Sequence, residues 1–215
     1  MSKNILIGVP CMDQVPAGFC SSLARLRKID NCVLNMQCGS LVYDSRNKIA
    51  KIALQTKADY ILWLDSDMLF DPDILERLMA DIEKGRDIVS GLYYRRAHPF
   101  TPVAFSELDI NPDDDTATFK NYTGPFTGVN EVAGVGFGCV LMKTDVIFDC
   151  FAAYNTCFSP MAHMGEDLAF CWRARQQGYK IFLDADVKCG HIGQYIITED
   201  FYKNYAEGGA DDAVN

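Results

Sequence analysis

Five consecutive large apolar residues, YILWL at 60–64, constrain the fold of this chain more than any other segment. Successive side chains of a strand point to opposite faces, so an unbroken apolar run requires that both faces be covered. Strands of this kind are typical of parallel sheets in α/β proteins. The run therefore predicts a central strand in a sheet that carries helices on both sides.

The segments around this strand alternate between strand and helix patterns. Short apolar runs at 4–10, 33–37 and 87–94 predict further strands, and helical spacing of apolar residues at 17–28 and 44–57 predicts helices between them. Connections between parallel strands are right-handed crossovers that place helices on the sheet. The alternation predicts a three-layer α/β fold with a mostly parallel central sheet.

Later segments extend this pattern and then depart from it. Asp71 and Pro72 predict the N-cap and first turn of a helix, and its apolar stripe consists of Ile74, Leu75, Leu78, Met79 and Ile82. Residues 98–130 are rich in Pro, Asp, Thr and Gly, which predicts irregular chain or a hairpin. The segment from Gly165 to Gly178 predicts a helix that ends at the second glycine.

The charge balance limits the classes of partner. The chain has 29 acidic and 20 basic residues, for a net charge of −9, which argues against non-specific binding to nucleic acid or anionic lipid. We see neither a signal peptide nor an apolar span of membrane length, and the nine cysteines form no CxxC pair. These features predict a cytoplasmic protein with reduced thiols.

The residues Asp65-Ser66-Asp67 follow the apolar strand directly. Ligands of open α/β sheets collect at the carboxyl ends of strands, and in an extended chain both carboxylates would face one site. Two carboxylates at so short a distance repel each other unless a cation lies between them. A hard divalent cation such as Mg²⁺ or Mn²⁺ fits this role and commonly bridges nucleotide phosphates. Alternatively, Asp65 caps a turn and Asp67 caps the next helix, and the tripeptide alone does not separate the two interpretations.

The order of these features resembles the GT-A glycosyltransferases, especially the family 2-like group. The resemblance covers residues 4 to 195: a βαβα start, the DSD motif after a strand, a helix that opens with DPD, a GED helix and a later histidine. It implies a Rossmann-like GT-A catalytic domain over 1–195, with a nucleotide-binding half at 1–97 and an acceptor-side half at 98–195. We expect the tail, 196–215, to be partly disordered.

The resemblance also implies a metal site. In that family the Asp-x-Asp motif binds the metal and the nucleotide diphosphate, so Asp65 would lie near the ribose and the metal, and Asp67 would be a direct ligand. The position that matches the family's histidine ligand is His191. Imidazole beside carboxylates favours Mn²⁺ slightly over Mg²⁺. Without the motif, His191 would be read as an ordinary histidine at a strand end.

The acidic pair at the start of the GED helix matches the segment that supplies the catalytic base of inverting family members. Asp167 is the first candidate and Glu166 the second. A base must lie within hydrogen-bond reach of the acceptor hydroxyl to take its proton. The alternative is that both carboxylates only stabilise the helix through its dipole.

Several further positions match the donor-binding parts of the family. The turn after the first strand corresponds to the site of the base and ribose, Arg46-Asn47 resembles a Ser/Ala-Arg-Asn segment, and the glycines at 134–138 match a floor beneath the sugar. Arg46 could instead be an exposed helix residue, and residues 93–96 either line the cleft or form a polar loop. The implied donor-binding residues are Pro10, Cys11, Arg46, Asn47, Asp65, Ser66 and Gly136.

The resemblance implies a metal-dependent transfer of sugar from a nucleotide diphosphate sugar to an acceptor hydroxyl, with inversion favoured and a UDP-sugar favoured over a GDP-sugar. The acceptor stays open, and the acidic balance disfavours nucleic acid without excluding a modified base. A nucleotidyltransferase is one alternative, although GVPCMDQVPAG at 8–18 has no basic residue for a triphosphate. The other alternative is a sugar-nucleotide binding protein without catalysis.

Overall fold

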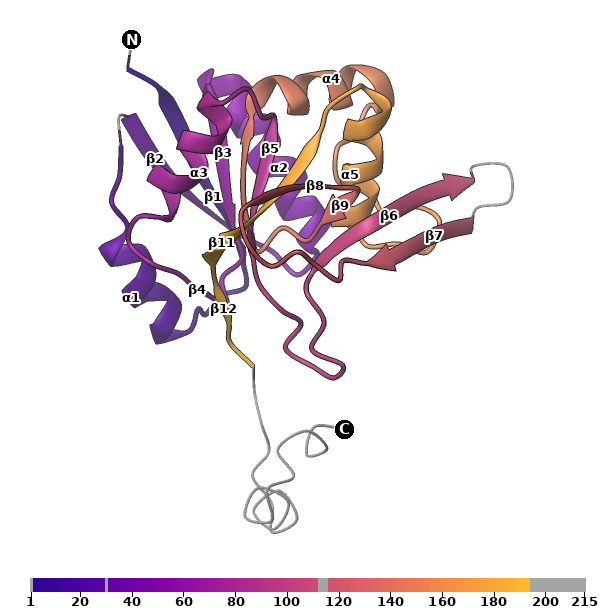
Figure 1. Cartoon of the computed structure of the whole chain (residues 1–215). Coiled ribbons are helices and arrows are strands. Elements are labelled where there is room, and N and C mark those ends of the chain that lie inside the picture. The colour runs from indigo at the N-terminus through magenta and orange to yellow at the C-terminus, as the bar shows by residue number, and fades with distance from the viewer. Residues whose placement is uncertain (1, 30, 112–115, 194–215) are drawn as a thin grey trace, which may run out of the picture.

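The structure is a computed structural model that describes residues 2–29, 31–111 and 116–193 (Figure 1). Its main sheet has seven strands in the order β2-β1-β3-β10-β5-β11-β8. Five of them run in one direction, while β10 and β8 run in the other, so the prediction of a mostly parallel sheet is confirmed. The strands are β1 (Asn4–Cys11), β2 (Asn31–Cys38), β3 (Tyr60–Leu64), β5 (Ile88–Leu92), β8 (Val129–Val132), β10 (Cys139–Lys143) and β11 (Ile181–Lys188).

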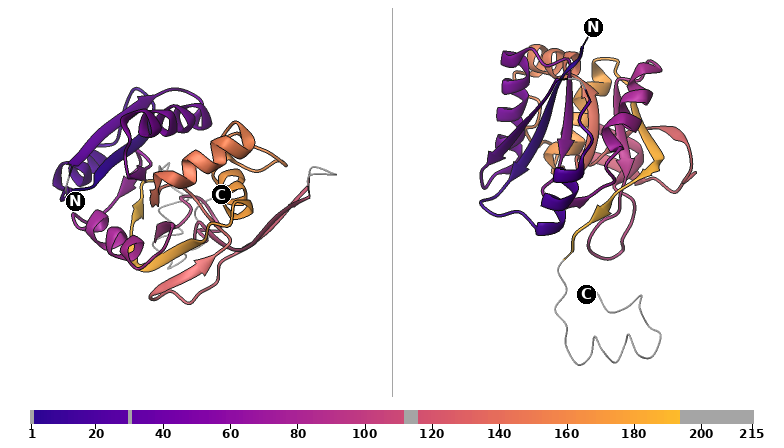
Figure 2. Two further views of the ribbon diagram at one scale, coloured as in Figure 1. Left: turned by 90° about the horizontal axis from the view of Figure 1, so that it is seen from above. Right: turned by 90° about the vertical axis from the view of Figure 1, so that its left-hand side faces the viewer.

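Helices cover both faces of this sheet (Figure 2). Along β3, Ile61 and Trp63 belong to one buried cluster and Leu62 and Leu64 to the other, as the two-residue period of a strand requires. The first cluster includes residues of α2 (Val42–Thr56), α4 (Thr144–Tyr154) and α5 (Glu166–Gln176), and the second includes residues of α1 (Ala17–Arg25) and α3 (Ile74–Glu83). The predicted three-layer arrangement is therefore confirmed.

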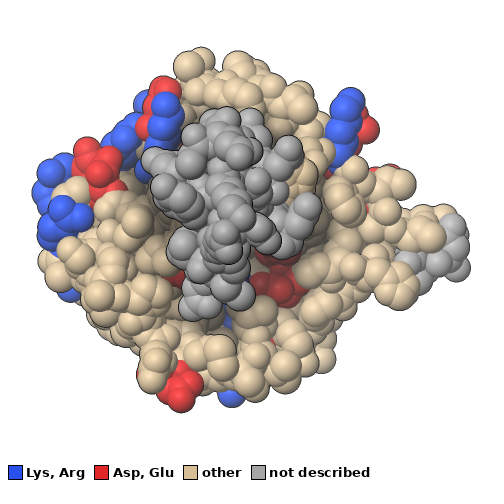
Figure 3. Space-filling model, turned by 90° about the horizontal axis from the view of Figure 1, so that it is seen from below, with Lys and Arg blue, Asp and Glu red and all other residues tan. Residues whose placement is uncertain are grey.

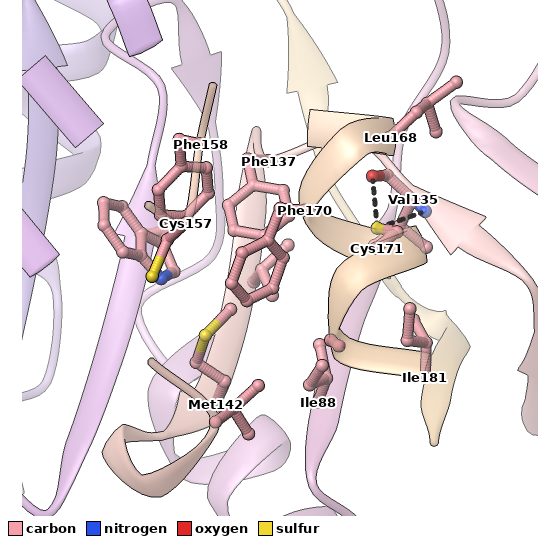
Figure 4. Packing of buried hydrophobic residues seen from close by; sticks show 14 of the residues in the cluster. Ile88, Val135, Phe137, Met142, Cys157, Phe158, Leu168, Phe170, Cys171 and Ile181 are labelled. Atoms are coloured by element: carbon pink, nitrogen blue, oxygen red, sulfur yellow. Dashed lines mark hydrogen bonds between the residues drawn. The ribbon is translucent and has the colours of Figure 1, made fainter. Parts of the chain in front are cut away.

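Aromatic rings fill the layer between β3 and the helices α4 and α5 (Figure 4). Phe158 and Phe170 stack with ring centres 4.7 Å apart, and Phe137 meets both of them edge-on. Trp63 of β3 contacts Phe158 at 5.1 Å. This cluster fixes α5 against the sheet, and with it the acidic residues at the start of that helix.

Two small sheets lie outside the main one. A hairpin of β6 (Ala104–Asn111) and β7 (Thr116–Asn121) pairs with β9 (Gly134–Val135) and projects from the body (Figure 1). For residues 98–130 the sequence predicted either irregular chain or a hairpin, and the structure confirms the hairpin. The second sheet pairs β4 (Met68–Leu69) with β12 (Gly190–His191). This pairing brings the end of the described chain beside the segment that follows β3.

The start of α3 differs from the prediction. The helix begins at Ile74 with Asp73 as its N-cap residue, so the assignment of Asp71 as the cap is wrong. Asp71 and Pro72 instead form a turn, in which the Ile74 N–H donates to the Asp71 carbonyl and the Pro72 carbonyl accepts from the Arg27 N–H. The predicted apolar stripe is buried as expected.

The remaining expectations concern the domain and its surroundings. The two predicted halves share one sheet, because β10 lies between β3 and β5. The predicted tail, 196–215, lies outside the described residues. Within the ranges that the structure describes, no helix has the length and apolar character needed to cross a membrane.

The aromatic cluster predicts a large effect of a single truncation. Phe170→Ala removes a fully buried ring and should lower the free energy of unfolding by about 3–5 kcal/mol, because it leaves a cavity. Phe148→Ala is the matched control, since Phe148 is 61% exposed, and should change it by less than about 0.5 kcal/mol. Urea denaturation of both variants measures the difference, and equal effects would contradict the packing described here.

Candidate active site

The DSD motif forms a tight turn at the carboxyl end of β3. The Asp65 N–H donates to the Gly138 carbonyl at 3.0 Å, and the Met68 N–H donates back to the Asp65 carbonyl at 3.2 Å. The extended chain, which was the condition for both carboxylates to face one site, is therefore not what the structure has. As a result, the two carboxylates take different partners, and Asp65 and Asp67 do not converge on one point.

Asp65 is held by Arg46, a guanidinium from the first turns of α2. Arg46 Nη2 donates to Asp65 Oδ1 at 2.7 Å, and Arg46 Nε donates to Glu166 Oε1 at 3.1 Å. The Arg46 side chain is only 3% exposed and lies over the ring of Phe137. Burial alone would lower the pKa of Arg46, but the charges of Asp65 and Glu166 raise it. The interpretation of Arg46 as an exposed helix residue is wrong.

Asp65 and Glu166 contact the buried Arg46 guanidinium, and Asp167 lies near enough for its charge to act on it. Burial raises the pKa of Asp65 despite the Arg46 charge. Burial, and next the charge of Glu166, raise the pKa of Asp167 to about 6. Glu166 is tied to Arg46, whereas Asp167 Oδ1 accepts the N–H of Leu168 at 2.8 Å. A carboxylate with a pKa near neutrality suits proton transfer, which favours Asp167 over Glu166 as a base.

Asp67 faces His191 across the β4–β12 pair. Asp67 Oδ2 lies 3.3 Å from His191 Nε2, and the Ile192 N–H donates to the Asp67 carbonyl at 2.8 Å. His191 Nδ1 lies 2.9 Å from the Tyr94 carbonyl, which can only accept, so Nδ1 carries a hydrogen. In the neutral ring, Nε2 then carries a lone pair on the side of the ring that faces the Asp67 carboxylate.

The charges at this pair shift both pKa values. When the ring is protonated, His191 Nε2 donates a hydrogen bond to the Asp67 carboxylate, and this bond is the largest cause that raises the pKa of His191. Burial would raise the pKa of Asp67, but its bond to His191 and the charges of His191 and Arg96 lower it. Both shifts stabilise a protonated His191 beside an ionised Asp67.

The side chains of Asp67 and His191 carry donor atoms of the kinds that a divalent cation can bind. In the described part of the chain, no group of three or more His, Cys, Asp or Glu side chains is placed to hold a metal ion. Asp67 and His191 offer one carboxylate oxygen and one imidazole nitrogen, and Mg²⁺ or Mn²⁺ often completes such a set with water and substrate phosphates. Asp65 points to Arg46 instead.

A pocket of about 250 Å³ opens beside this pair at the carboxyl ends of β1, β2 and β3. Figure 3 shows this end of the molecule, with acidic side chains recessed near the centre. The pocket contains five residues that the sequence predicted, namely Pro10, Cys11, Asp65, Ser66 and Asp67. It also contains five that the sequence analysis missed, namely Met12, Gly39, Ser40, Val42 and Ser45. For Gly39 and Ser40 the signal was the short polar break, CGS at 38–40, between the second strand and the next helix.

Two other predicted donor-binding residues serve packing in this structure. The Asn47 side-chain oxygen accepts the backbone N–H groups of Cys157 and Phe158. A side chain at Gly136 would place its Cβ 2.2 Å from the Tyr93 hydroxyl oxygen. Gly136 is thus required for the close approach of Tyr93, and the space next to it is filled by protein.

Comparisons with known proteins agree on the fold. Residues 21–150 match the family described as glycosyl transferase family 2. The crystal structure of A197 from STIV has a TM-score of 0.58 and 16% identity, over 91% of this chain and 97% of that one. GalNAc-T7 with UDP, GalNAc and Mn²⁺ has a TM-score of 0.61 and 11% identity, over 90% of this chain and 44% of that one. No curated protein matches the chain.

The Arg46 contacts predict a destabilised variant with a distinctive pH dependence. Arg46→Met leaves Asp65 and Glu166 without their shared cation, and should lower the free energy of unfolding at pH 7.5 by about 3–5 kcal/mol. Protonation of the carboxylates removes the repulsion, so the loss should be smaller at pH 5. Arg95→Met, at an exposed position, is the control for denaturation at both pH values. A loss that does not change with pH would contradict the electrostatic explanation.

Proposed function

The chain belongs to glycosyl transferase family 2 and is a glycosyltransferase with the GT-A fold, and we propose that it uses a divalent metal and a nucleotide diphosphate sugar. The observation that carries this proposal is the Asp67–His191 pair at the edge of the pocket beyond β3. One carboxylate oxygen and one imidazole nitrogen face each other there, beside a pocket at the strand ends. Nucleotide phosphates would complete the coordination.

We propose that the pocket of about 250 Å³ holds the nucleoside of a UDP-sugar. The carboxyl ends of strands are where α/β sheets bind such ligands. The structurally similar GalNAc-T7 was solved with UDP, GalNAc and Mn²⁺, which supports UDP over GDP as the first donor to test. Asp65, fixed by Arg46, would face the ribose from the wall of the pocket.

Asp67 and His191 would hold Mn²⁺ or Mg²⁺ in this proposal. Such an ion, when bound, neutralises the negative charge that develops on the leaving diphosphate. His191 is held in the orientation for this role by its bond to the Tyr94 carbonyl, which keeps Nε2 as the free nitrogen of the neutral ring. Backbone pairing of β4 with β12 fixes the separation of the two donors.

Asp167 would act as the base in an inverting transfer. The acceptor oxygen attacks the anomeric carbon, the bond from that carbon to the diphosphate oxygen breaks, and Asp167 takes the proton of the acceptor hydroxyl. Glu166 supports this role indirectly. It holds Arg46 and adds a negative charge that raises the pKa of Asp167.

This role predicts a pH profile with an acidic limb. Asp167 must be ionised to accept a proton, so kcat/KM should fall about tenfold per pH unit below a pKa near 6. Asp167→Asn should reduce kcat by at least about 100-fold while nucleotide binding is kept. Steady-state rates with a donor panel test both points, and full activity of the variant would assign the base to another residue.

Calorimetric titration tests the proposed donor site. UDP and GDP are titrated into the protein with Mn²⁺ and with EDTA, and we expect UDP to bind only when the metal is present. Asp67→Ala should weaken this binding at least tenfold, because it removes the metal's carboxylate ligand. Asp71→Ala, at an exposed aspartate beyond the turn, is the matched control and should bind like the wild type.

Either of two results would overturn the proposal. One is the absence of binding by both nucleotides in the presence of Mn²⁺. The other is binding that changes with neither EDTA nor Asp67→Ala, which would leave the aspartates as residues of a turn.

A further inference from the structure

Asp67 forms an ion pair with Arg96 in addition to its contact with His191. Arg96 Nη1 donates to Asp67 Oδ2 at 2.5 Å, and this is the same oxygen that faces His191 Nε2 at 3.3 Å. A divalent ion that bonds to both Oδ2 and Nε2 would lie close to the Arg96 guanidinium, and two positive charges at such a distance repel strongly. Metal binding and the Arg96–Asp67 ion pair therefore compete for one carboxylate oxygen.

The backbone that carries Arg96 is built into the site. Tyr93, which follows β5, accepts the Gly138 N–H through its hydroxyl oxygen at 3.1 Å and meets the His191 ring edge-on at 5.6 Å. The next carbonyl, that of Tyr94, accepts from His191 Nδ1. The Arg95 N–H then donates to the Thr101 carbonyl at 3.0 Å. These contacts hold residues 93–95, the segment that leads to Arg96, in place beside His191.

The Arg96 side chain, by contrast, has room to change partners. It is 56% exposed, whereas Asp67 is 23% exposed. It lines a second pocket, of about 450 Å³, together with Pro16, Asp67, Ala97 and Ile192. Asp67 lines this pocket and also the pocket assigned to the nucleoside. The guanidinium is thus next to the boundary between the two pockets.

We propose that Arg96 is a diphosphate-binding residue that leaves Asp67 and bonds the diphosphate when the donor binds. In the free protein it neutralises Asp67, and when Asp67 binds the metal the guanidinium transfers to the diphosphate oxygens. Arginine suits this exchange because its planar donors match phosphate as well as carboxylate. The inference rests on the proposed donor site, and it adds that the site recognises the second phosphate of a nucleoside diphosphate.

The exchange predicts effects of opposite sign in one variant. Arg96→Met removes the competitor from Asp67, so the protein should bind Mn²⁺ alone about two- to fivefold more tightly, the range for a half-exposed ion pair. The same variant should bind UDP at saturating Mn²⁺ about tenfold or more weakly, because a charged hydrogen bond to phosphate is lost. Its affinity for UMP, which lacks the second phosphate, should stay within about twofold of the wild type.

Electron paramagnetic resonance of free Mn²⁺ gives the metal affinity, and calorimetry gives the nucleotide affinities. Arg95→Met is the matched control, an exposed arginine of the same loop, and should match the wild type in all three titrations. Arg96→Lys keeps the charge without the planar fork, so we expect Mn²⁺ affinity like the wild type and an intermediate affinity for UDP.

Three results would overturn the inference. They are unchanged or weaker Mn²⁺ binding by Arg96→Met, unchanged UDP binding by that variant, and an equal loss for UMP and UDP. Failure of the donor site itself looks different, because the wild type would then bind neither UDP nor GDP with Mn²⁺. If wild-type UDP binding proves independent of metal, the metal proposal fails, and an unchanged UDP affinity in Arg96→Met would still overturn the role of Arg96.

Discussion

One buried guanidinium organises the active end of this protein. Arg46 bonds Asp65 at the end of β3 and Glu166 at the start of α5, so it joins two segments that are about a hundred residues apart in the chain. An isolated buried charge would be strongly unfavourable, and so would three neighbouring carboxylates without a cation. The cluster is therefore stable only when Arg46 and its carboxylates are all present. It places Asp65 and Asp167 at the same edge of the sheet.

This pairing also separates the roles of the two aspartates of the motif. Both aspartates line the pocket beyond β3, but Asp65 is bound to Arg46, so Asp67 is the carboxylate that faces His191. The turn between them directs the two side chains to different partners, and the short β4–β12 pairing holds the histidine in place. The result is a fixed group of charges around Arg46 next to a carboxylate, Asp67, that His191 and Arg96 share.

Much of the fold could be predicted from the sequence, because the strongest patterns in the sequence are local. The apolar run at 60–64 predicts a strand buried on both faces, and the stripe after Pro72 predicts a helix buried on one face. The structure confirms both predictions. The local environment of Asp65 could not be predicted, because beside the turn bond from the Met68 N–H its own N–H bonds Gly138, far along the chain. The burial of Arg46 depends on Glu166 in the same way, and only the fold shows that Asn47 and Gly136 serve packing. Gly39 and Ser40 escaped notice because two small residues between a strand and a helix look like an ordinary loop, and Val42 and Ser45 because they belong to the first turn of α2.

The most direct test of the proposed metal-dependent donor site is a crystal structure of the protein with UDP and Mn²⁺, with diffraction measured at the manganese absorption edge. The anomalous signal identifies the ion independently of any assumption about its ligands. We predict one strong peak about 2.0–2.2 Å from Asp67 Oδ2 and His191 Nε2, with the diphosphate on its open side and the uridine in the pocket beyond β1. A peak elsewhere, or UDP bound without an ion at Asp67, would contradict the proposed site.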